Sequence, residues 1–349
     1  MMVERNLTGL LIRDADTVRV GLGRINATPH LIQLVVNADG VMVGTLTDGD
    51  IRRGLLNGCD LNSPVAACMS PSPRVARTYA GALEELSRLR SSRRAVPVVD
   101  DAGRPQYLVA SSGSDDTIAA ALVMAGGFGR RLGRITESLP KPLVPVNGVP
   151  ILGHTLMRLA DAGVGNIYVA VHYLREQIRD YVKSLAIAPE VTLIEEDPPL
   201  GTAGAIGLLP RVLNGTLLVI NGDIMTRADF GAMLAHHRSQ GSDLTVAAAR
   251  YEFEIPFGVI QYDGEGRLES ITEKPRHASF VSAGLYLMEP GIRHLVERGV
   301  RIDMPELFLR AKQSGHRVDV FAMHEAWIDV GRPDDIRLAE TYDRESREH

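Results

Sequence analysis

A short apolar run that ends in a glycine-rich turn constrains this chain more than any other feature of its sequence. The run from Leu122 to Ala125 has the length of a buried strand, and Gly126, Gly127 and Gly129 follow it closely. Glycine permits a sharp turn that directs consecutive N–H groups to one side, where they can bind phosphate oxygens. The segment therefore predicts a strand that leads into a phosphate-binding loop.

Two cations follow this turn. Arg131 offers a planar guanidinium with five donors, and Lys141 lies between two prolines. Two common phosphate motifs are excluded, because Leu132 replaces the third glycine of a dinucleotide-binding loop and no Gly-Lys-Ser/Thr follows as in a P-loop. Arg131 and Lys141 are the candidate catalytic residues, since they can neutralise charge that grows on a phosphoryl group. The alternative is a plain strand-to-helix turn with solvated cations.

The stretch from Leu122 to about Glu340 resembles the sugar-phosphate nucleotidyltransferases. Their signature, Gly-Gly-x-Gly-x-Arg-Leu followed by Pro-Lys-Pro, is present, and further motifs follow in the family's order: Leu200-Gly-Thr-Ala-Gly-Ala205, Asn221-Gly-Asp223, Phe257-Gly-Val-Ile260, Glu273-Lys-Pro275, Ser282-Ala-Gly-Leu-Tyr286 and Trp327-Ile-Asp-Val-Gly331. Arg134 stands where many members carry proline, and Ser282 where they usually carry asparagine. The resemblance implies an enzyme that joins a nucleotide to a sugar 1-phosphate and releases pyrophosphate.

Strand-like runs alternate with segments of helix length beyond the glycine loop. The runs are Asn166–Val171, Val191–Ile194, Thr216–Ile220 and Asp243–Ala248. Such alternation predicts an α/β domain whose sheet is mostly parallel, with ligands at the strand ends. The segments Phe257–Tyr262 and Phe280–Met288 look antiparallel, so we expect a Rossmann-like mixed sheet.

The resemblance places the nucleotide at Ala125, Gly126, Gly127, Gly129, Gly201 and Thr202. Gly201 permits close approach of a ligand, and the Thr202 hydroxyl can bond a base edge, although both residues would serve equally well to start a helix. The motif Leu-Gly-Thr-Ala-Gly is most similar to the mannose-1-phosphate and heptose-1-phosphate guanylyltransferases. GTP is therefore the favoured nucleotide, with uridylyl or thymidylyl transfer as the alternative.

Two aspartates are the candidate metal ligands. Asp223 and Asp329 each leave a strand-like run beside small residues. Magnesium prefers carboxylate and phosphate oxygens, so two carboxylates and a triphosphate suffice to bind it. A turn aspartate at Asp223 and a surface aspartate at Asp329 are the alternatives. The family position favours Mg²⁺ as the cofactor.

The resemblance assigns the sugar phosphate to Gly258, Glu273, Lys274, Ser282 and Gly284. Glu273 would accept hydrogen bonds from sugar hydroxyls, and Lys274 would pair with the phosphate. Taken alone, such a Glu-Lys pair is more often a solvated charge pair. Glucosamine, mannose and heptose 1-phosphates remain open as substrates.

The first third of the chain contains an internal repeat. Residues Leu34–Thr47 align with Pro97–Ala110, each as a strand, a glycine turn and a second strand, and helix-compatible segments precede them at about Val18–Asn26 and Tyr79–Arg90. This arrangement resembles a tandem pair of cystathionine-β-synthase (CBS) domains, a Bateman module, over residues 1–115. Such pairs are usually regulatory and often stack on a second copy, so the resemblance implies a homo-oligomer.

Thr47 and Asp50 match the CBS family's Thr-x-x-Asp, which implies a ribose site for an adenine nucleotide. The aligned positions of the second copy, Ala110 and Gly113, lack both groups. A purely structural, dimer-forming module is the alternative, and Asp50 could instead cap a helix that begins at Ile51.

Length, charge and composition fit this organisation. The chain has 349 residues, a net charge of −5 and 5% aromatic residues, which predicts about two domains and argues against a nucleic-acid surface. We place the boundary in the small, polar segment 111–116, with the nucleotidyltransferase domain at 116–349. No apolar run reaches membrane-spanning length, the first residues do not form a signal peptide, and Cys59 and Cys68 have no metal-ligand spacing. We expect a cytoplasmic protein with reduced thiols.

Nucleotidyltransferases with an N-terminal CBS pair are similar to bacterial enzymes that make GDP-sugars, including GDP-glucosamine for nonulosonic acids. The competing hypothesis is a catalytically silent regulatory subunit that binds a sugar nucleotide. Retention of Arg131, Lys141, Asp223 and Asp329 together argues against it.

Overall fold

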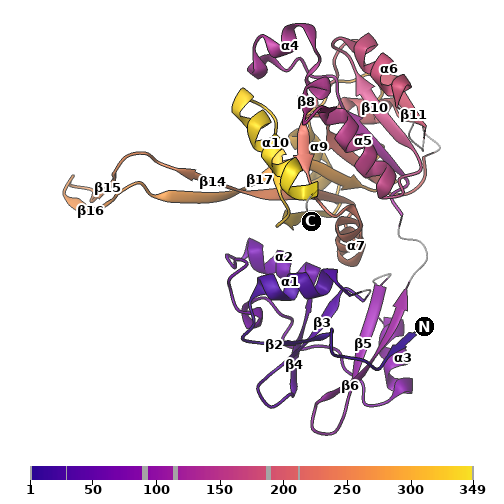
Figure 1. Ribbon diagram of the computed structural model, residues 1–349, viewed down its shortest axis with the longest axis vertical. Coiled ribbons are helices and arrows are strands. Elements are labelled where there is room, and N and C mark those ends of the chain that lie inside the picture. Colours follow the sequence, from indigo (N-terminus) through magenta and orange to yellow (C-terminus); the bar gives the residue numbers. More distant parts are fainter. Residues whose placement is uncertain are drawn as a thin grey trace.

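The computed structural model describes residues 2–28, 30–88, 93–112, 117–185, 190–210 and 213–347, which form two modules (Figure 1). Among the described residues, the N-terminal module runs to residue 112 and the C-terminal module starts at residue 117. The predicted linker lies largely outside the described residues, since residues 113–116 are not among them. No helix among the described residues is both long and apolar enough to span a membrane.

The N-terminal module contains two three-stranded sheets. One orders β2 (Leu11–Arg13), β3 (Ile32–Val36) and β4 (Met42–Thr47) and carries α1 (Val18–Asn26) and α2 (Asp48–Leu56); the other orders β1 (Met2–Glu4), β6 (Pro105–Ser112) and β5 (Arg93–Val99) and carries α3 (Tyr79–Arg88). Both halves show the predicted helix, strand, turn and strand. Gly40 and Gly103 make the turns with φ of +76° and +79°, where a side chain would be strained.

A seven-stranded mixed sheet forms the centre of the C-terminal module. Its order is β11 (Val191–Glu195), β10 (Ile167–Val171), β7 (Ala120–Met124), β12 (Leu217–Asn221), β17 (Arg276–Met288), β14 (Leu244–Glu254) and β18 (Val318–Met323). The first four strands are mutually parallel, and β17 runs antiparallel to both of its neighbours. The predicted mixed, parallel-rich α/β fold is therefore confirmed.

Both faces of this sheet are buried, as the apolar sequence of β7 requires. Ala121 and Val123 pack into one core with α5 (Ile151–Asp161) and α7 (Phe230–Gln240), while Ala120 and Leu122 pack into another with α9 (Met304–Gln313). The remaining helices are α4 (Ile135–Ser138), α6 (Arg175–Ser184), α8 (Pro290–Arg293) and α10 (Pro333–Arg347), and the short strands are β8 (Pro145–Val146), β9 (Val149–Pro150), β13 (Ile224–Thr226) and β19 (Trp327–Asp329).

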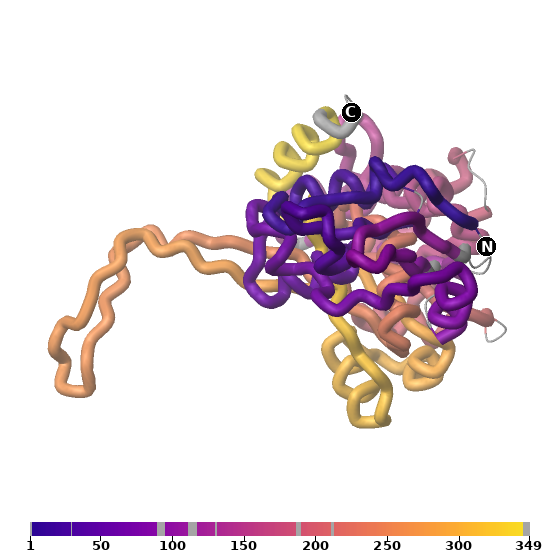
Figure 2. The backbone as a smooth tube through the Cα atoms, turned by 90° about the horizontal axis from the view of Figure 1, so that it is seen from below, coloured from indigo at the N-terminus to yellow at the C-terminus, as the bar shows by residue number. Residues whose placement is uncertain are grey.

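A long two-stranded arm projects from the C-terminal module. The outer halves of β14 and β17 leave the sheet together, and the ribbon continues into β15 (Val259–Tyr262) and β16 (Leu268–Thr272). Figures 1 and 2 both show this arm, residues 250–280, extending away from the body of the molecule. The antiparallel pairing of this region agrees with the sequence prediction, whereas its projection was not anticipated.

The two modules meet where α2 packs against β18. Arg52 of α2 is 1% exposed, and its guanidinium lies 3.6 Å from the centre of the Phe321 ring. It donates hydrogen bonds to the Ala322 carbonyl at 2.7 Å and to Glu325 at 2.9 Å, and it pairs with Asp48 at 2.5 Å. Burial alone would lower the pKa of Arg52, but the carboxylates of Asp48 and Glu325 raise it. Arg52 therefore remains charged inside the contact.

Candidate active site

The glycine loop after β7 is closely packed on one side and open on the other. A Cβ atom added at Gly126 would lie 2.5 Å from Oε2 of Glu196, and one added at Gly129, where φ is +63°, would lie 3.0 Å from the Lys141 side chain. The Thr136 hydroxyl donates to the Gly129 carbonyl at 2.9 Å and so holds the loop. At Gly127 the added Cβ would meet none of the described atoms outside its own chain neighbours within 4 Å. This open side leaves room for a ligand to approach the backbone.

Lys141 joins the two candidate metal ligands. Its buried ammonium lies 2.6 Å from Oδ2 of Asp223 and 3.4 Å from Oδ1 of Asp329. Arg131 reaches the other side of Asp329 at 4.0 Å, and its side chain is 69% exposed. Four charged residues that were predicted separately from the sequence therefore converge on one place. We call Arg131, Lys141, Asp223 and Asp329 the charged cluster.

Strand pairing explains this convergence across more than a hundred residues of sequence. Asp223 lies two residues beyond the end of β12 and directly before β13, which pairs antiparallel with β19, so that Ile224 lies opposite Asp329. The Val330 amide donates to the Asp223 carbonyl at 3.0 Å and closes the pair. The two carboxylates are thus fixed side by side next to the glycine loop.

This carboxylate pair fits a divalent cation that takes further ligands from its substrates. Carboxylate oxygens are the hard donors such ions prefer. Among the described residues no group of three or more His, Cys, Asp or Glu side chains is placed to hold a metal. A cation here would therefore depend on phosphate oxygens and water for the rest of its coordination.

The residues predicted to bind the sugar phosphate fall into two groups. Ser282 and Gly284 lie in β17 near the charged cluster, because a Cβ atom at Gly284 would meet the Asn221 side chain at 2.6 Å. Gly258, Glu273 and Lys274 lie on the arm (Figure 1), where a Cβ atom at Gly258 would be 2.9 Å from Oε2 of Glu273. The structure brings these three together with each other, but not with the glycine loop of the same chain.

The segment with Gly201 and Thr202 follows β11 and is hydrogen-bonded to the start of α9. Gly201 has φ of +81°, and the Thr202 amide donates to Asp303 at 2.8 Å. The Thr202 hydroxyl donates to Asp303 at 3.2 Å and accepts a hydrogen bond from the Met304 amide at 2.8 Å. A short 3-10 helix, Gly204–Leu208, follows two residues later. The hydroxyl proposed for base recognition is therefore already bonded within the chain.

Sequence reasoning did not single out Glu196, which the structure places behind Gly126. The residue is 3% exposed, and its Oε1 atom has no hydrogen-bond partner among the described residues. Burial raises the pKa of its carboxyl group above the ordinary value. A buried carboxyl group beside a ligand loop is the kind of acceptor that a bound base can satisfy. In the sequence, only its position directly after the strand β11 could have identified Glu196 as a site residue.

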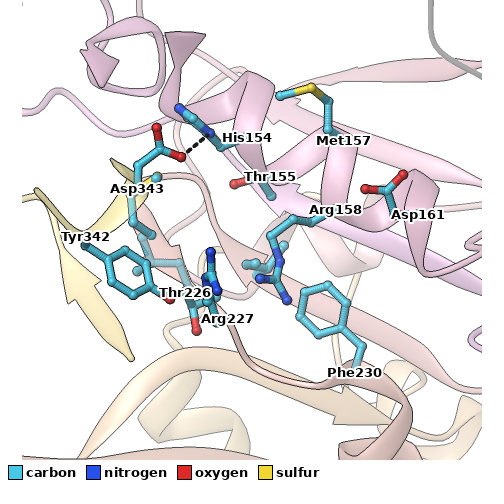
Figure 3. A pocket seen from close by; sticks show the side chains of 13 residues that line it. His154, Thr155, Met157, Arg158, Asp161, Thr226, Arg227, Phe230, Tyr342 and Asp343 are labelled. Carbon is cyan, nitrogen blue, oxygen red and sulfur yellow. Dashed lines mark ion pairs between the residues drawn. The ribbon is translucent and has the colours of Figure 1, made fainter. Parts of the chain in front are cut away.

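A separate cavity of about 430 Å³ lies on the other side of β13, between α5 and α10 (Figure 3). Nε of Arg158 and the Tyr342 hydroxyl are buried there without a partner among the described residues, and burial raises the pKa of Tyr342 to about 12. Asp343 lies 3.8 Å from His154 at its rim. None of the predicted site residues lines this cavity.

The predicted ribose pair of the N-terminal module forms a helix cap. The Thr47 amide and hydroxyl donate to Asp50 at 2.8 and 2.6 Å, and α2 begins at Asp48 rather than at Ile51. Thr47 also lines a cavity of about 350 Å³ between the modules, together with Arg53 of α2 and His236 of α7. Burial lowers the pKa of His236 to about 4, and both ring nitrogens lack a partner among the described residues.

Comparison with known proteins agrees with this geometry. The model of the nucleotidyl transferase family matches residues 120–346. The catalytic subunit beta of mannose-1-phosphate guanylyltransferase from Drosophila pseudoobscura pseudoobscura is 32% identical over 225 residues, which are 62% of this chain and 60% of the relative. A putative mannose-1-phosphate guanyltransferase from Sulfolobus acidocaldarius is 31% identical over 225 residues, covering 62% of this chain and 61% of the relative.

The chain thus spans about 60% of the length of these relatives. Among solved structures, HddC from Yersinia pseudotuberculosis complexed with GMP-PN matches with a TM-score of 0.52 and 25% identity, covering 65% of this chain and 100% of HddC. The family match includes the glycine loop and the entire charged cluster. The chain belongs to the nucleotidyl transferase family.

Proposed function

We propose that this protein transfers a guanylyl group from GTP to a sugar 1-phosphate and releases pyrophosphate. The observation that carries the proposal is the charged cluster beside the open side of the glycine loop, with Lys141 2.6 Å from Asp223 and 3.4 Å from Asp329. Further support comes from the relatives, whose names specify guanylyl transfer to mannose 1-phosphate. Mannose, heptose and glucosamine 1-phosphates are the candidate acceptors.

In the proposed mechanism the protein positions the reactants and neutralises charge. The sugar phosphate is already an ionised nucleophile, so its oxygen attacks the α-phosphorus in line and pyrophosphate leaves without a protein base. The amides of Gly126 and Gly127 bind the triphosphate, and Arg131 and Lys141 stabilise charge that grows on the transferred group. A divalent cation, proposed as Mg²⁺ on Asp223 and Asp329, would add positive charge at the phosphate oxygens when bound.

Guanine is proposed as the base because of Glu196. Guanine presents two adjacent N–H donors on its Watson–Crick edge, which a carboxylate can accept together, whereas uracil and thymine present a single N–H there. The unpartnered Oε1 of Glu196, behind Gly126, supports this pairing. Ser282 and Gly284 would contact the sugar from β17, and Gly201 would let the base approach.

We further propose that the N-terminal module is a CBS pair that binds an adenine nucleotide. Support comes from the repeated helix, strand, turn and strand, and from the cavity lined by Thr47 and Arg53. To bind the ribose, the Asp50 carboxylate would have to accept hydrogen bonds from the ribose hydroxyls while it still accepts the hydrogen bond from the Thr47 amide that caps α2. A module that only holds two copies together is the alternative.

Pyrophosphate release tests the enzymatic proposal. The purified protein is assayed with Mg²⁺ and GTP, UTP, dTTP, CTP or ATP against glucosamine, mannose, glucose and heptose 1-phosphates. Release with GTP and one sugar phosphate is the expected result. Release with UTP or dTTP would overturn the base assignment but keep the mechanism. Silence across all pairs, also with AMP present, would favour a regulatory subunit that binds a sugar nucleotide without turning it over.

A further inference from the structure

The outer part of the arm has one apolar face that is largely exposed among the described residues. In the β15–β16 ribbon, Ile260 lies opposite Ile271 and Tyr262 lies opposite Leu268, so all four side chains share a face. They are between 55% and 69% exposed. On the other face, Gln261 and Ser270 are joined by a hydrogen bond of 2.9 Å. A two-stranded ribbon is marginally stable in water, so an apolar face of this size calls for a covering surface.

The same arm carries Glu273 and Lys274, to which the family resemblance assigns the sugar and its phosphate. Glu273 and Lys274 follow β16 directly, and Lys274 is held at φ +46° while its amide donates to the Phe257 carbonyl at 3.3 Å. A residue other than glycine in this backbone region is under strain. Among the described residues no ion pair involves the side chain of Glu273 or Lys274. The backbone at Lys274 is therefore held by the ribbon, while both charged side chains are exposed and have no ion-pair partner among the described residues.

The arm cannot deliver these charges to its own site. β14 and β17 stay paired without interruption from Ala248–Ser282 to Glu254–Arg276, and the last pair is joined by an ion pair of 3.1 Å. The Ile255 amide then bonds to the Pro275 carbonyl at 3.0 Å, which extends the ribbon towards its tip. Folding back onto the glycine loop of the same chain would break this ladder. Figures 1 and 2 show the tip far from the body from two directions.

From these observations we infer that two copies of this chain exchange arms, and that each active site is completed by the partner's arm. This inference rests on the proposed function. One chain supplies the glycine loop and the charged cluster, while the partner's Lys274 meets the phosphate of the incoming sugar. A twofold axis makes the exchange reciprocal, so both sites are built in the same way.

The rim of the site offers a surface that suits the apolar face of an arm. Phe128 in the glycine loop is 41% exposed, and Ile135 just beyond Arg131 is 40% exposed. Phe128 belongs to the loop that would bind the triphosphate, and Ile135 begins the short helix α4 that follows it. An arm seated on this rim would bury its own apolar face and bring Glu273 and Lys274 next to the phosphates in one step. A second copy is thus the occupant whose position accounts for both features of the arm.

Complementation between two inactive variants tests the exchange. The Arg131→Ala chain has a damaged charged cluster with an intact arm, and the Lys274→Asn chain has the reverse. Asparagine suits this test because it tolerates the left-handed backbone while removing the charge. Each variant alone should be nearly inactive. When the two variants are mixed and their subunits exchange, half of the dimers are heterodimers. Each heterodimer has one intact site of two, so the rate should recover to about one quarter of wild type.

Activity that stays at the level of the separate variants after subunit exchange would overturn the arm exchange, because each site would then be built from a single chain. A wild-type protein that sediments as a monomer under assay conditions would also overturn it. The matched control pairs the Arg131→Ala chain with an Asp223→Ala chain. Both lesions lie in the same half of the site, so this mixture should not recover.

A second measurement does not depend on turnover, and so separates failure of the arm exchange from failure of the proposed function. Chymotrypsin cuts after exposed aromatic residues such as Phe257 and Tyr262 on the arm. Cleavage there should be suppressed at concentrations where the dimer forms and should return on dilution. The double variant Ile260→Ser, Ile271→Ser should be cut at all concentrations, whereas Leu309→Ser, also exposed but on α9, should behave as wild type. Equal cleavage of the wild-type arm at every concentration would contradict the exchange.

Discussion

At the scale of single residues, the two cations of the charged cluster differ in burial, since Lys141 is buried and Arg131 is exposed. Arg131 is 69% exposed and only approaches Asp329 at 4.0 Å, so the fold does not depend on it. We predict that Arg131→Ala lowers turnover by roughly two decades or more, as removal of a preorganised donor does, with an unchanged melting temperature. Steady-state pyrophosphate release and thermal unfolding measure the two effects. Arg134→Ala, on the same exposed loop, is the control and should keep near-normal turnover; near-normal turnover in Arg131→Ala would reject its role.

Glu196 gives the residue-scale prediction for base choice. A carboxamide offers only one acceptor where the carboxylate offers two, so Glu196→Gln should reduce the preference for GTP over UTP by about tenfold or more. The ratio of kcat/KM values for the two nucleotides measures this preference. Its neighbour Glu195 is exposed and pairs with Arg175 and Arg179, so Glu195→Gln serves as the matched control. An unchanged ratio in Glu196→Gln would mean that another group reads the base.

At the scale of secondary-structure elements, the contact between α2 and β18 depends on one buried arginine. Removing Arg52 leaves Asp48 and Glu325 as partly buried carboxylates without their cation, although Asp48 also faces His324 at 3.4 Å. We predict that Arg52→Ala lowers the free energy of unfolding by about 3–5 kcal/mol and exposes the module boundary to proteolysis. Urea denaturation and limited proteolysis provide the measurements. The adjacent Arg53 is half exposed, and Arg53→Ala should have a much smaller effect; equal losses would show that the contact is not held by Arg52.

The elements also show where sequence reasoning succeeds. The parallel strands were predictable because β7 and β12 are continuous apolar runs, which only a sheet covered on both faces accommodates. The charged cluster could be predicted as a set of residues, but not as a contact. Lys141 and Asp329 meet only through the pairing of β13 with β19, whose three-residue strands leave little periodic signal. The arm was predictable as paired strands, yet alternation along Ile260 and Tyr262 does not reveal whether a surface lies against it.

At the scale of the whole molecule, the cavity between the modules offers a place where binding of the proposed adenine nucleotide could change the affinity of the active site for GTP. Its walls include Thr47 at the end of β4, Arg53 of α2 and His236 of α7, a helix packed on the seven-stranded sheet. A ligand that touches both walls stabilises one arrangement of the two modules. By linkage, any factor by which AMP changes the affinity for GTP must equal the factor by which GTP changes the affinity for AMP.

We therefore predict that AMP or ATP raises the melting temperature of the protein, and that the increase disappears in Arg53→Ala and in Asp50→Ala. The increase must be compared within each variant, because Asp50 caps α2 and its loss alone should cost about 1 kcal/mol. Arg53→Ala leaves the cap bonds between Thr47 and Asp50 in place and is the cleaner test. Titration calorimetry of AMP with and without GTP then measures the coupling. No increase with any adenine nucleotide would instead assign the N-terminal module to assembly.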